Sequence, residues 1–446
     1  MSEDGAEQRY VKEAFDTNWV VPLGPNVNAF EQDLENFMTP SPALPEGEGA
    51  RKRVVALSSG TAAVHLGLLC AGVKPGDEVI VQSFTFCAST HPVTYLGAKP
   101  VLVDSEPDTW NIDPELMEEA IKDRIAKTGK KPAAIVPVAL YGMPYKADRI
   151  MEIANKYGIP VVEDAAEGFG SRYKGRVLGT FGKYGVLSFN GNKMITTSGG
   201  GALITEDEDH WREVMMYATQ YRESYPYYQH EKIGYNYRMS NICAGIGRGQ
   251  MTVVEDHLKH HKHVQKMYEE LLADVPGVHV HSQPDEWSMV HGQRSMVYDS
   301  NYWLCTITID SSVRVKGQEN AYKTIVTGAV GGAAGVIHAA ESAHTDCEPN
   351  ANVEAMRVAL DKAQIEARPV WKPMHKQPCY LQGNVKIEKC KNENISCVTS
   401  DSSIAYVNGV SEALFKVGMC LPAGPYVTDD DVRYIVDTIK AAIERA

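Results

Sequence analysis

The 446-residue sequence predicts an α/β fold with a large, mostly parallel β-sheet. From residue 54 to residue 205, short runs rich in β-branched residues alternate with longer helical patterns, which is typical of such sheets. The seven runs predicted as strands are "VVAL" (54–57), "EVIVQ" (78–82), "KPVLVD" (99–104), "AAIVPVAL" (133–140), "IPVVED" (159–164), "YGVLSF" (184–189) and "GALIT" (201–205). Because the last two runs lie too close together for a crossover helix, we expect one edge of the sheet to be antiparallel.

The pattern changes after about residue 240 and predicts a second, smaller domain. We assign residues 1–255 to a large domain with its N-terminal segment, and residues 256–446 to a smaller C-terminal α/β domain. Residues 241–275 predict one long helix that leads from the first domain to the second. The last helix, over residues 429–446, has apolar residues at helical spacing, and residues 428–431 supply the Thr and Asp of a capping box.

Residues 311–350 contain a Gly/Ala-rich stretch, "KTIVTGAVGGAAGVIHAAESA", that we interpret as an insertion in the second domain. Its pattern of strand, glycine turn and helix also suggests a dinucleotide-binding motif. The glycines, however, do not follow the GxGxxG spacing, and no acidic residue ends a following strand at the expected distance. An insertion is therefore the better interpretation. Residues 40–50, "PSPALPEGEGA", predict a surface loop.

The composition excludes several classes of function. The chain carries 44 Lys and Arg residues against 57 Asp and Glu residues, a formal net charge of −13, and it has no basic run. Nucleic acid is therefore not an expected partner. The sequence has neither a long apolar run nor the apolar core of a secretion signal, so we expect no membrane helix and a cytoplasmic location. The nine cysteines show no CxxC pair or zinc spacing, which predicts reduced thiols and no metal site.

The stretch "YGVLSFNGNKMITTSGGGALIT", residues 184–205, places a single lysine, Lys193, on a turn between two predicted strands. A lysine with a chemical role needs a fixed stem, few competing charges and space for a ligand. The glycines and small polar residues around Lys193 meet these needs. The alternative is a solvated turn lysine, but the position of Lys193, 29 residues after Asp164, favours the chemical role.

Polar and aromatic residues follow two other predicted strands. Gly60 and Thr61 lie where the strand at 54–57 gives way to a helix, and backbone N–H groups at a helix N-terminus attract phosphate. Phe86 lies just past the strand at 78–82, where it could stack on a flat ligand. Taken alone, Gly60 and Thr61 more often mark only a helix cap, and Phe86 fits a core phenylalanine equally well. In an open α/β fold, however, all of them lie with Lys193 at the carboxyl ends of the strands, where ligands bind.

Asp164 completes a set that is coherent for pyridoxal 5′-phosphate (PLP). It ends a buried apolar strand, where a carboxylate needs a partner, and the pyridinium nitrogen of PLP is one. An N-cap or a salt bridge is the alternative. Lys193 would form a Schiff base with the cofactor and act as a general base. Ser188 would hold the phosphate, and Asn190 would support the site.

These motifs, in the order GT, TF, EDAA, SFxxxK and GYNYRMSN, resemble the sugar-nucleotide aminotransferases of the DegT class, from about residue 22 to residue 432. The resemblance implies a fold-type I PLP enzyme that works as a homodimer with shared active sites. It makes Lys193 the cofactor lysine, Asp164 the pyridine partner, and Thr61 and Ser188 phosphate ligands.

Two positions in these motifs extend the implied site. Asn236 of "GYNYRMSN" would reach the phosphate in the neighbouring subunit, and Arg238 of the same motif would contact substrate. Glu167 stands where many members of the family have glutamine in "EDAAQ". We assign it to the cofactor site, with its contact to the ring oxygen or the substrate left open.

A narrower likeness, carried by "SFNGNKMITTSGGG", "YATQYRE", "GYNYRMSN", "ARPVWKPMH" and "CLPAG", is to the aminotransferase of UDP-bacillosamine synthesis. It implies amino transfer from L-glutamate to C4 of UDP-2-acetamido-2,6-dideoxy-α-D-xylo-hexos-4-ulose, which gives UDP-2-acetamido-4-amino-2,4,6-trideoxyglucose. Lys372 and His375 would supply positive or hydrogen-bonding groups to the substrate, and Trp371 would pack on a sugar or base. An interdomain turn is the alternative for Trp371.

Other functions stay open at this stage. The substrate could be another nucleotide-linked 3- or 4-keto sugar. A PLP sugar dehydratase is disfavoured, because that branch replaces the lysine by histidine and this chain keeps Lys193. A non-catalytic regulator with a PLP fold is also disfavoured, because Asp164, Ser188 and Lys193 are all present and no helix-turn-helix is appended.

Overall fold

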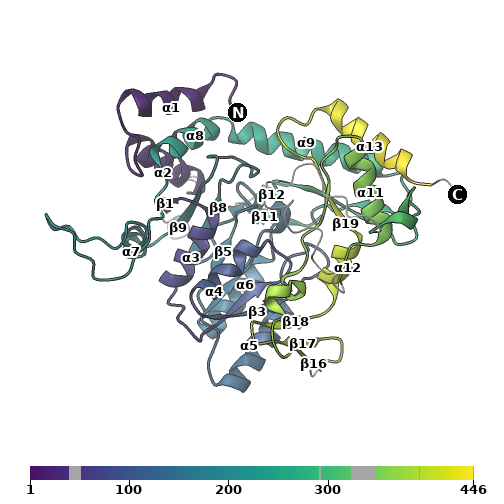
Figure 1. The fold of residues 1–446 in the computed structure, drawn as a ribbon, viewed down its shortest axis with the longest axis horizontal. Helices are drawn as coiled ribbons and strands as arrows, with labels where there is room; N and C mark the ends of the chain where they lie inside the picture. The colour runs from purple at the N-terminus through teal and green to yellow at the C-terminus, as the bar shows by residue number, and fades with distance from the viewer. Residues whose placement is uncertain (40–51, 291–292, 323–346, 391, 445–446) are drawn as a thin grey trace.

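The structure, a computed structural model, describes residues 1–39, 52–290, 293–322, 347–390 and 392–444. The predicted loop at 40–50 lies outside the described residues, as does most of the predicted insertion, residues 323–346. Figure 1 shows a central sheet with helices on both faces and, on the C-terminal side, a second layer of strands and helices. Within the described ranges, no helix has both the length and the apolar composition that crossing a membrane requires.

The large sheet contains all seven predicted strands. In spatial order they are β1 (Arg53–Leu57), β9 (Gly201–Thr205), β8 (Tyr184–Ser188), β5 (Val162–Asp164), β4 (Ala134–Val136), β2 (Glu78–Gln82) and β3 (Lys99–Val103). Parallel bridges from Ile135 to Val161 and from Val138 to Asp164 join β4 to β5. β9 pairs antiparallel with both β1 and β8, whereas the other pairs are parallel, so the predicted antiparallel edge is confirmed.

Three further strands continue this sheet beyond β3. They are β18 (Ile404–Val407), which pairs parallel with β3, and the antiparallel β17 (Ser396–Thr399) and β16 (Lys386–Lys389). The sequence analysis predicted none of them. A stretch of the C-terminal half therefore belongs to the large sheet, and the domain boundary at residue 255 stays a prediction.

Helices cover the sheet because each buries an apolar face against it. α3 (Gly60–Cys70) packs on β8 and β9. The remaining helices of this part are α4 (His91–Tyr95), α5 (Pro114–Thr128), α6 (Ala147–Tyr157) and α7 (Glu208–Ala218). At the N-terminus, α1 (Ala6–Asp16) and α2 (Pro25–Met38) pack against α8 (Asn241–Met251).

The single helix predicted over 241–275 was wrong, because the chain forms two helices, α8 and α9 (Val254–Leu272). At the junction the N–H groups of Thr252 and Val253 donate to carbonyls three residues back, and the Thr252 hydroxyl also donates to the Gly249 carbonyl. These tighter bonds replace the regular helical ladder and end α8.

The smaller part contains an antiparallel sheet of β10 (Val278–Val280), β14 (Cys305–Ile309), β19 (Gly418–Leu421) and β15 (Arg368–Pro369). α9, α11 (Ala351–Lys362) and α13 (Asp429–Ala442) share a hydrophobic core with it, while α12 (Val410–Val417) lies beside β14 and β19. α13 begins after Thr428 with the predicted capping box to Asp431. Two small sheets, β11 (Trp287–Val290) with β12 (Gln293–Met296), and β13 (Tyr298–Asp299) with β6 (Arg172–Tyr173) and β7 (Arg176–Val177), complete the strands.

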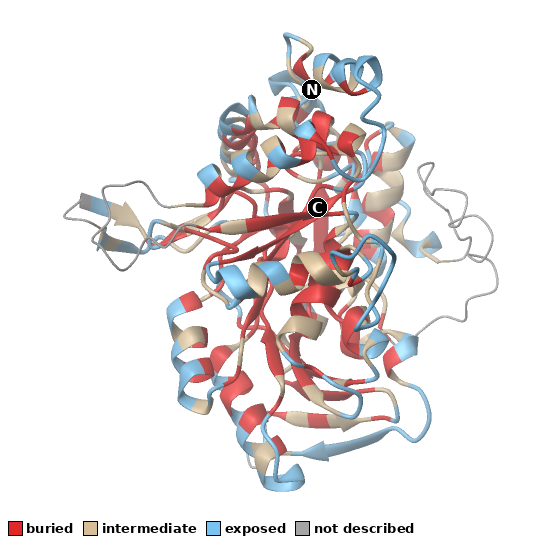
Figure 2. Ribbon diagram, turned by 90° about the vertical axis from the view of Figure 1, so that its left-hand side faces the viewer, coloured by how far each residue is buried: buried red, intermediate tan, exposed pale blue. Residues whose placement is uncertain are grey.

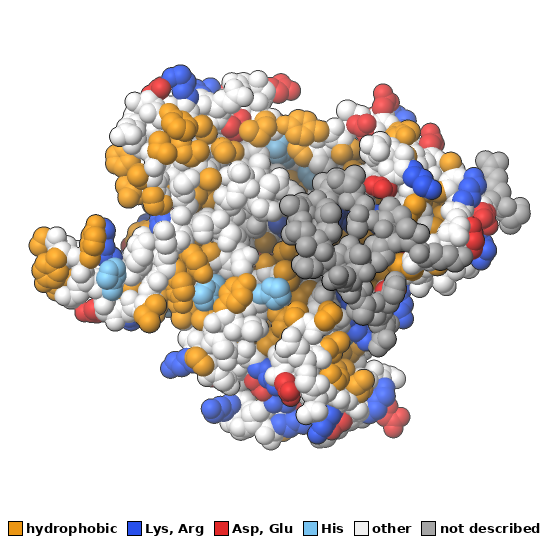
Figure 3. Space-filling view, viewed as in Figure 1, with side chains coloured by type: hydrophobic (Ala, Val, Ile, Leu, Met, Phe, Trp, Pro, Cys, Tyr) orange, Lys and Arg blue, Asp and Glu red, His pale blue; other side chains and the backbone are white. Residues whose placement is uncertain are grey.

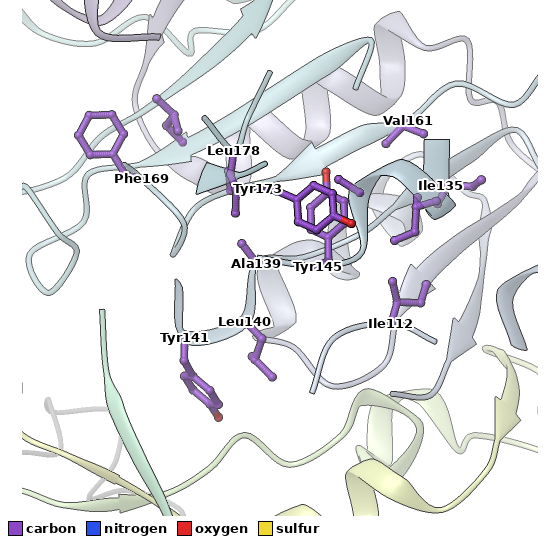
Figure 4. Packing of buried hydrophobic residues seen from close by; sticks show 14 of the residues in the cluster. Ile112, Ile135, Ala139, Leu140, Tyr141, Tyr145, Val161, Phe169, Tyr173 and Leu178 are labelled. Carbon is purple, nitrogen blue, oxygen red and sulfur yellow. The ribbon is translucent and has the colours of Figure 1, made fainter. Parts of the chain in front are cut away.

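Buried residues concentrate on the central strands and on the inner faces of the helices (Figure 2). The largest hydrophobic cluster lies on one face of the large sheet and includes the segment from Ala139 to Leu178, part of which Figure 4 shows around Tyr145. A second cluster fills the smaller part. The cores hold the carboxyl ends of the strands in fixed positions, and these strand ends carry the site.

Candidate active site

A cavity of about 360 Å³ lies at the carboxyl ends of β5, β8 and β1. Nine of the thirteen residues that the sequence analysis assigned to the site line it: Gly60, Thr61, Phe86, Asp164, Glu167, Ser188, Asn190, Lys193 and Trp371. They come from segments far apart in the chain, and the parallel strands bring them to one edge of the sheet.

Lys193 follows β8 on a turn that its own backbone N–H closes by donating to the Asn190 carbonyl, at 3.0 Å. Its side chain is only 12% exposed, and Nζ lies 3.3 Å from Oε1 of Glu167. Nζ also lies 3.9 Å from the centre of the Trp303 ring system. The lysine therefore projects into the cavity instead of into solvent.

Asp164 ends β5 and is 3% exposed. Oδ2 accepts a hydrogen bond from the Ser89 hydroxyl at 2.7 Å, and Oδ1 accepts one from the Ala166 N–H at 3.1 Å. Burial raises the pKa of this carboxyl group, while the hydrogen bond from Ser89 lowers it. Within the described ranges no Lys or Arg forms an ion pair with Asp164, so a cationic ligand atom would supply the missing charge.

Glu167 lies beside Lys193 at the floor of the cavity. Its Oε1 faces Nζ of Lys193, and its Oε2 accepts the Tyr141 N–H at 2.8 Å. Burial raises the pKa of the Glu167 carboxyl group, and the charge of Lys193 lowers it. The sequence analysis left the contact of Glu167 open, and in the structure its carboxylate contacts Lys193.

The N-terminus of α3 points into the same cavity. Ser59 caps the helix, with its hydroxyl accepting the Ala62 N–H at 3.0 Å. A Cβ atom at Gly60 would lie 2.9 Å from Cβ of Ser188, so glycine is what allows the helix to start against β8. Gly60, Thr61 and Ser188 are thereby brought together at a helix N-terminus, a site suited to an anion.

The structure does not bring the other four predicted residues into this cavity. Arg238 pairs with Glu31 at 2.5 Å and donates to the Ala56 carbonyl. Lys372 lines an adjoining cavity of about 350 Å³ with Phe86 and Trp371.

His375 and Asn236 lie outside the cavity for different reasons. His375 is buried between the Ser83 hydroxyl, 2.7 Å from Nδ1, and Oε1 of Glu412, 3.1 Å from Nε2. The hydrogen bond from His375 is the main cause that lowers the pKa of Glu412 to about 2. Asn236 is exposed and pairs with Thr219 at the base of an arm, residues 219–237, that projects beyond α7 (Figure 1).

Sequence reasoning missed two residues of the site. Ser89, which holds Asp164, lies three residues after Phe86 in "SFTFCAST", and a second polar residue after a buried strand could have marked it. Trp303, whose indole N–H donates to the Asn192 carbonyl at 2.6 Å, is 111 residues from that partner. No local pattern points to it.

The residues present fit PLP. The helix N-terminus suits its phosphate, the buried carboxylate of Asp164 suits a protonated ring nitrogen, and Lys193 supplies the amine. The Phe86 ring is 51% exposed and offers a face for stacking.

The comparisons with known proteins agree with this geometry. The model of the DegT/DnrJ/EryC1/StrS aminotransferase family matches residues 1–330. The chain belongs to this family. Its members are PLP-dependent, so PLP is the cofactor and the protein is a PLP-dependent sugar aminotransferase of the DegT family.

Curated relatives span nearly the whole chain. EpsN of Bacillus subtilis, named for a pyridoxal phosphate-dependent aminotransferase activity, is 37% identical over 439 residues, which are 98% of this chain and 92% of EpsN. GDP-perosamine synthase of Caulobacter vibrioides is 39% identical over 442 residues, 99% of this chain and 95% of that enzyme.

Solved structures show the same fold. A DegT DnrJ EryC1 StrS aminotransferase from Brucella abortus matches with a TM-score of 0.74 and 23% identity, over 98% of this chain and 95% of that one. The aminotransferase TlmJ from Streptoalloteichus hindustanus matches with a TM-score of 0.72 and 22% identity, over 99% and 96% of the two chains. The protein therefore has the fold of a fold-type I PLP aminotransferase.

Proposed function

We propose that the protein transfers the amino group of L-glutamate to C4 of UDP-2-acetamido-2,6-dideoxy-α-D-xylo-hexos-4-ulose and forms UDP-2-acetamido-4-amino-2,4,6-trideoxyglucose. The observation that carries the proposal is the position of Lys193, whose Nζ lies inside a cavity that also contains Asp164 and the N-terminus of α3. The motif "ARPVWKPMH" and its neighbours support the choice of substrate.

Each residue has a distinct part in this proposal. PLP, when bound, supplies a ring that withdraws electrons from the carbon carrying the amino group. Asp164 keeps the ring nitrogen protonated, and the Gly60–Thr61 turn with Ser188 binds the phosphate. Nζ of Lys193 accepts a proton at one carbon and returns it at another, as a general base and then a general acid.

The nucleotide end of the substrate needs space beyond the cofactor cavity. The adjoining cavity of about 350 Å³ shares Thr85, Phe86 and Trp371 with the first one, and Lys372 and His91 also line it. We assign this cavity to the nucleotide, since Lys372 suits a diphosphate and Trp371 a flat ring. Arg238 and His375 pair with Glu31 and Glu412 instead, so we assign neither of them to direct substrate contact within one chain.

A second candidate substrate is the GDP-linked keto sugar whose amination gives GDP-perosamine. The Caulobacter vibrioides relative is named GDP-perosamine synthase, as is a relative from Escherichia coli O157:H7 that is 30% identical over 98% of this chain and 95% of that enzyme. Both candidates use the same cofactor chemistry and differ in the nucleotide and the sugar.

The visible spectrum of the PLP-loaded protein tests the proposal. L-Glutamate should remove the absorption band of lysine-bound PLP, and the UDP-linked keto sugar should restore it. Restoration by the GDP-linked sugar alone would select the second candidate. A band that persists in Lys193→Ala would overturn the assignment of the cofactor lysine.

We also propose a homodimer with shared active sites. Exposed apolar side chains lie over the N-terminal helices and on the arm, as Figure 3 shows, and they include Phe15, Leu23 and Tyr228. Asn236 at the base of the arm would then reach the partner's phosphate site. Mixing inactive Lys193→Ala with inactive Asn236→Ala should restore activity, because a mixed dimer contains one intact site. No recovery in mixtures shown to exchange subunits would contradict shared sites.

A further inference from the structure

We infer that Glu167 and Trp303 form a lysine clamp that holds the Lys193 ammonium group whenever the lysine is not bonded to the cofactor, and that Trp303 is a positioning residue of the reaction. The inference rests on the proposed role of Lys193 and adds two side chains, Glu167 and Trp303, that hold its amine in position and stabilise it while it carries a proton.

Both members of the lysine clamp lie within direct reach of Nζ. Oε1 of Glu167 is 3.3 Å away, and the centre of the Trp303 ring system is 3.9 Å away, well inside the limit of about 6 Å for a cation–π contact. Glu167 is 4% exposed and Trp303 is 3% exposed, so little solvent screens either contact. Asp164 is the other acidic group that interacts with Lys193 in the cavity.

Hydrogen bonds fix Trp303 in this position. Its indole N–H donates to the Asn192 carbonyl at 2.6 Å, one residue before Lys193. Its backbone N–H donates to Oδ1 of Asn301 at 2.8 Å. Nδ2 of Asn301 donates to the Glu167 and Phe169 carbonyls, each at 2.9 Å. Asn301 thus hydrogen-bonds to both members of the clamp and links the segment after β5 to the segment before β14.

The chemical consequence concerns the proton on Nζ. A buried carboxylate and the negative face of an indole both stabilise the charged amine over the neutral one. In the proposed reaction Nζ carries a proton between two carbons, and the clamp stabilises Nζ while it holds that proton. The indole also keeps the long lysine side chain in one place, which lowers the entropy lost when the lysine acts.

The test is the rate of Nζ labelling at pH 7 in the full chain loaded with pyridoxamine 5′-phosphate, where Lys193 is not bonded to the cofactor. Acetic anhydride and mass spectrometry would report the labelling of Lys193 relative to the exposed Lys74. We expect Trp303→Leu to speed this labelling about tenfold, the factor that corresponds to the loss of a cation–π contact of about 1.4 kcal/mol from the ammonium group. Glu167→Gln should speed it about tenfold or more, because the ammonium group then loses its buried carboxylate partner.

Trp303→Phe is the matched control. It keeps an aromatic face but loses the indole N–H, so Lys193 should be labelled within about twofold of the wild-type rate, a small fraction of the cation–π effect. Equal increases in the labelling rate of Trp303→Leu and Trp303→Phe, or no increase in Trp303→Leu and Glu167→Gln, would overturn the inference. If Trp303→Leu does not fold, the labelling rate of Glu167→Gln alone decides. Failure of the proposed role of Lys193 would show in a different experiment, as an absorption band of lysine-bound PLP that persists in Lys193→Ala.

Discussion

The close approach of Gly60 to Ser188 allows a quantitative test of the phosphate site. A Cβ at position 60 would lie 2.9 Å from Cβ and 3.1 Å from Oγ of Ser188, whereas ordinary contacts begin at 3.4 Å. Ser188 lies on β8 between two paired strands, so the start of α3 must move instead. Overpacking costs about 1–3 kcal/mol, and the better helix propensity of alanine offsets about 0.5–1 kcal/mol of it.

On balance Gly60→Ala should cost about 1 kcal/mol at the start of α3. Because the N–H groups that move are the ones proposed to bind the phosphate, we expect a similar loss of binding free energy, which weakens PLP binding roughly fivefold. Equilibrium dialysis of the cofactor-free protein measures this change. Pyridoxal, which lacks the phosphate, should bind Gly60→Ala and wild type within about twofold of each other. Gly199→Ala is the control, because Gly199 lines the same cavity but a Cβ there meets nothing within 4 Å. Unchanged PLP affinity in Gly60→Ala, or an equal loss in Gly199→Ala, would refute the reasoning.

Three further predictions concern pH, substrate and stability. Burial raises the pKa of Asp164 above its usual 3.8, so ionisation of this group destabilises the folded protein progressively as the pH rises from 3.8 through the raised pKa. Cofactor-free Asp164→Asn should therefore melt higher than wild type at pH 7, and this gain should disappear below pH 3.8. Lys372→Ala should raise the KM for the nucleotide sugar about tenfold in steady-state assays, with the L-glutamate half-reaction unchanged. Thr428→Ala removes the capping box of α13 and should lower the free energy of unfolding in urea by about 0.5–2 kcal/mol, whereas Thr438→Ala in the same helix should not.

The sequence was most informative where the structure is locally determined. The strands of the large sheet are continuous apolar runs, and the start of α13 follows from Thr428 and Asp431, so both were predicted correctly. The break at Thr252 was missed because it depends on three-residue hydrogen bonds that leave the helical spacing of apolar residues intact. β18 was missed because its place is set by pairing with β3, about 300 residues earlier, and β17 and β16 join the sheet through β18.

The candidate site also contains residues that local patterns predict and residues that depend on distant contacts. Asp164, Ser188 and Lys193 stand at the ends of recognisable strands, and the structure places them around one cavity. Trp303 reaches that cavity only because the smaller part packs against the larger one, a contact without a local pattern. Arg238 was assigned to the substrate from its motif, yet its nearest acidic group, Glu31, lies on α2 and could not be paired with it from sequence alone.

The pairing of β18 with β3 has a consequence for how the chain folds during synthesis. Ile404 lies beside Val101 in the finished sheet, so β3 has no neighbour on that side until β18, about 300 residues further along the chain, has left the ribosome. Until then β3 is an open edge, able to pair with strands of other chains. Translation that stops near residue 255 would leave this edge exposed permanently. β18 thus protects a strand that is made about 300 residues before it.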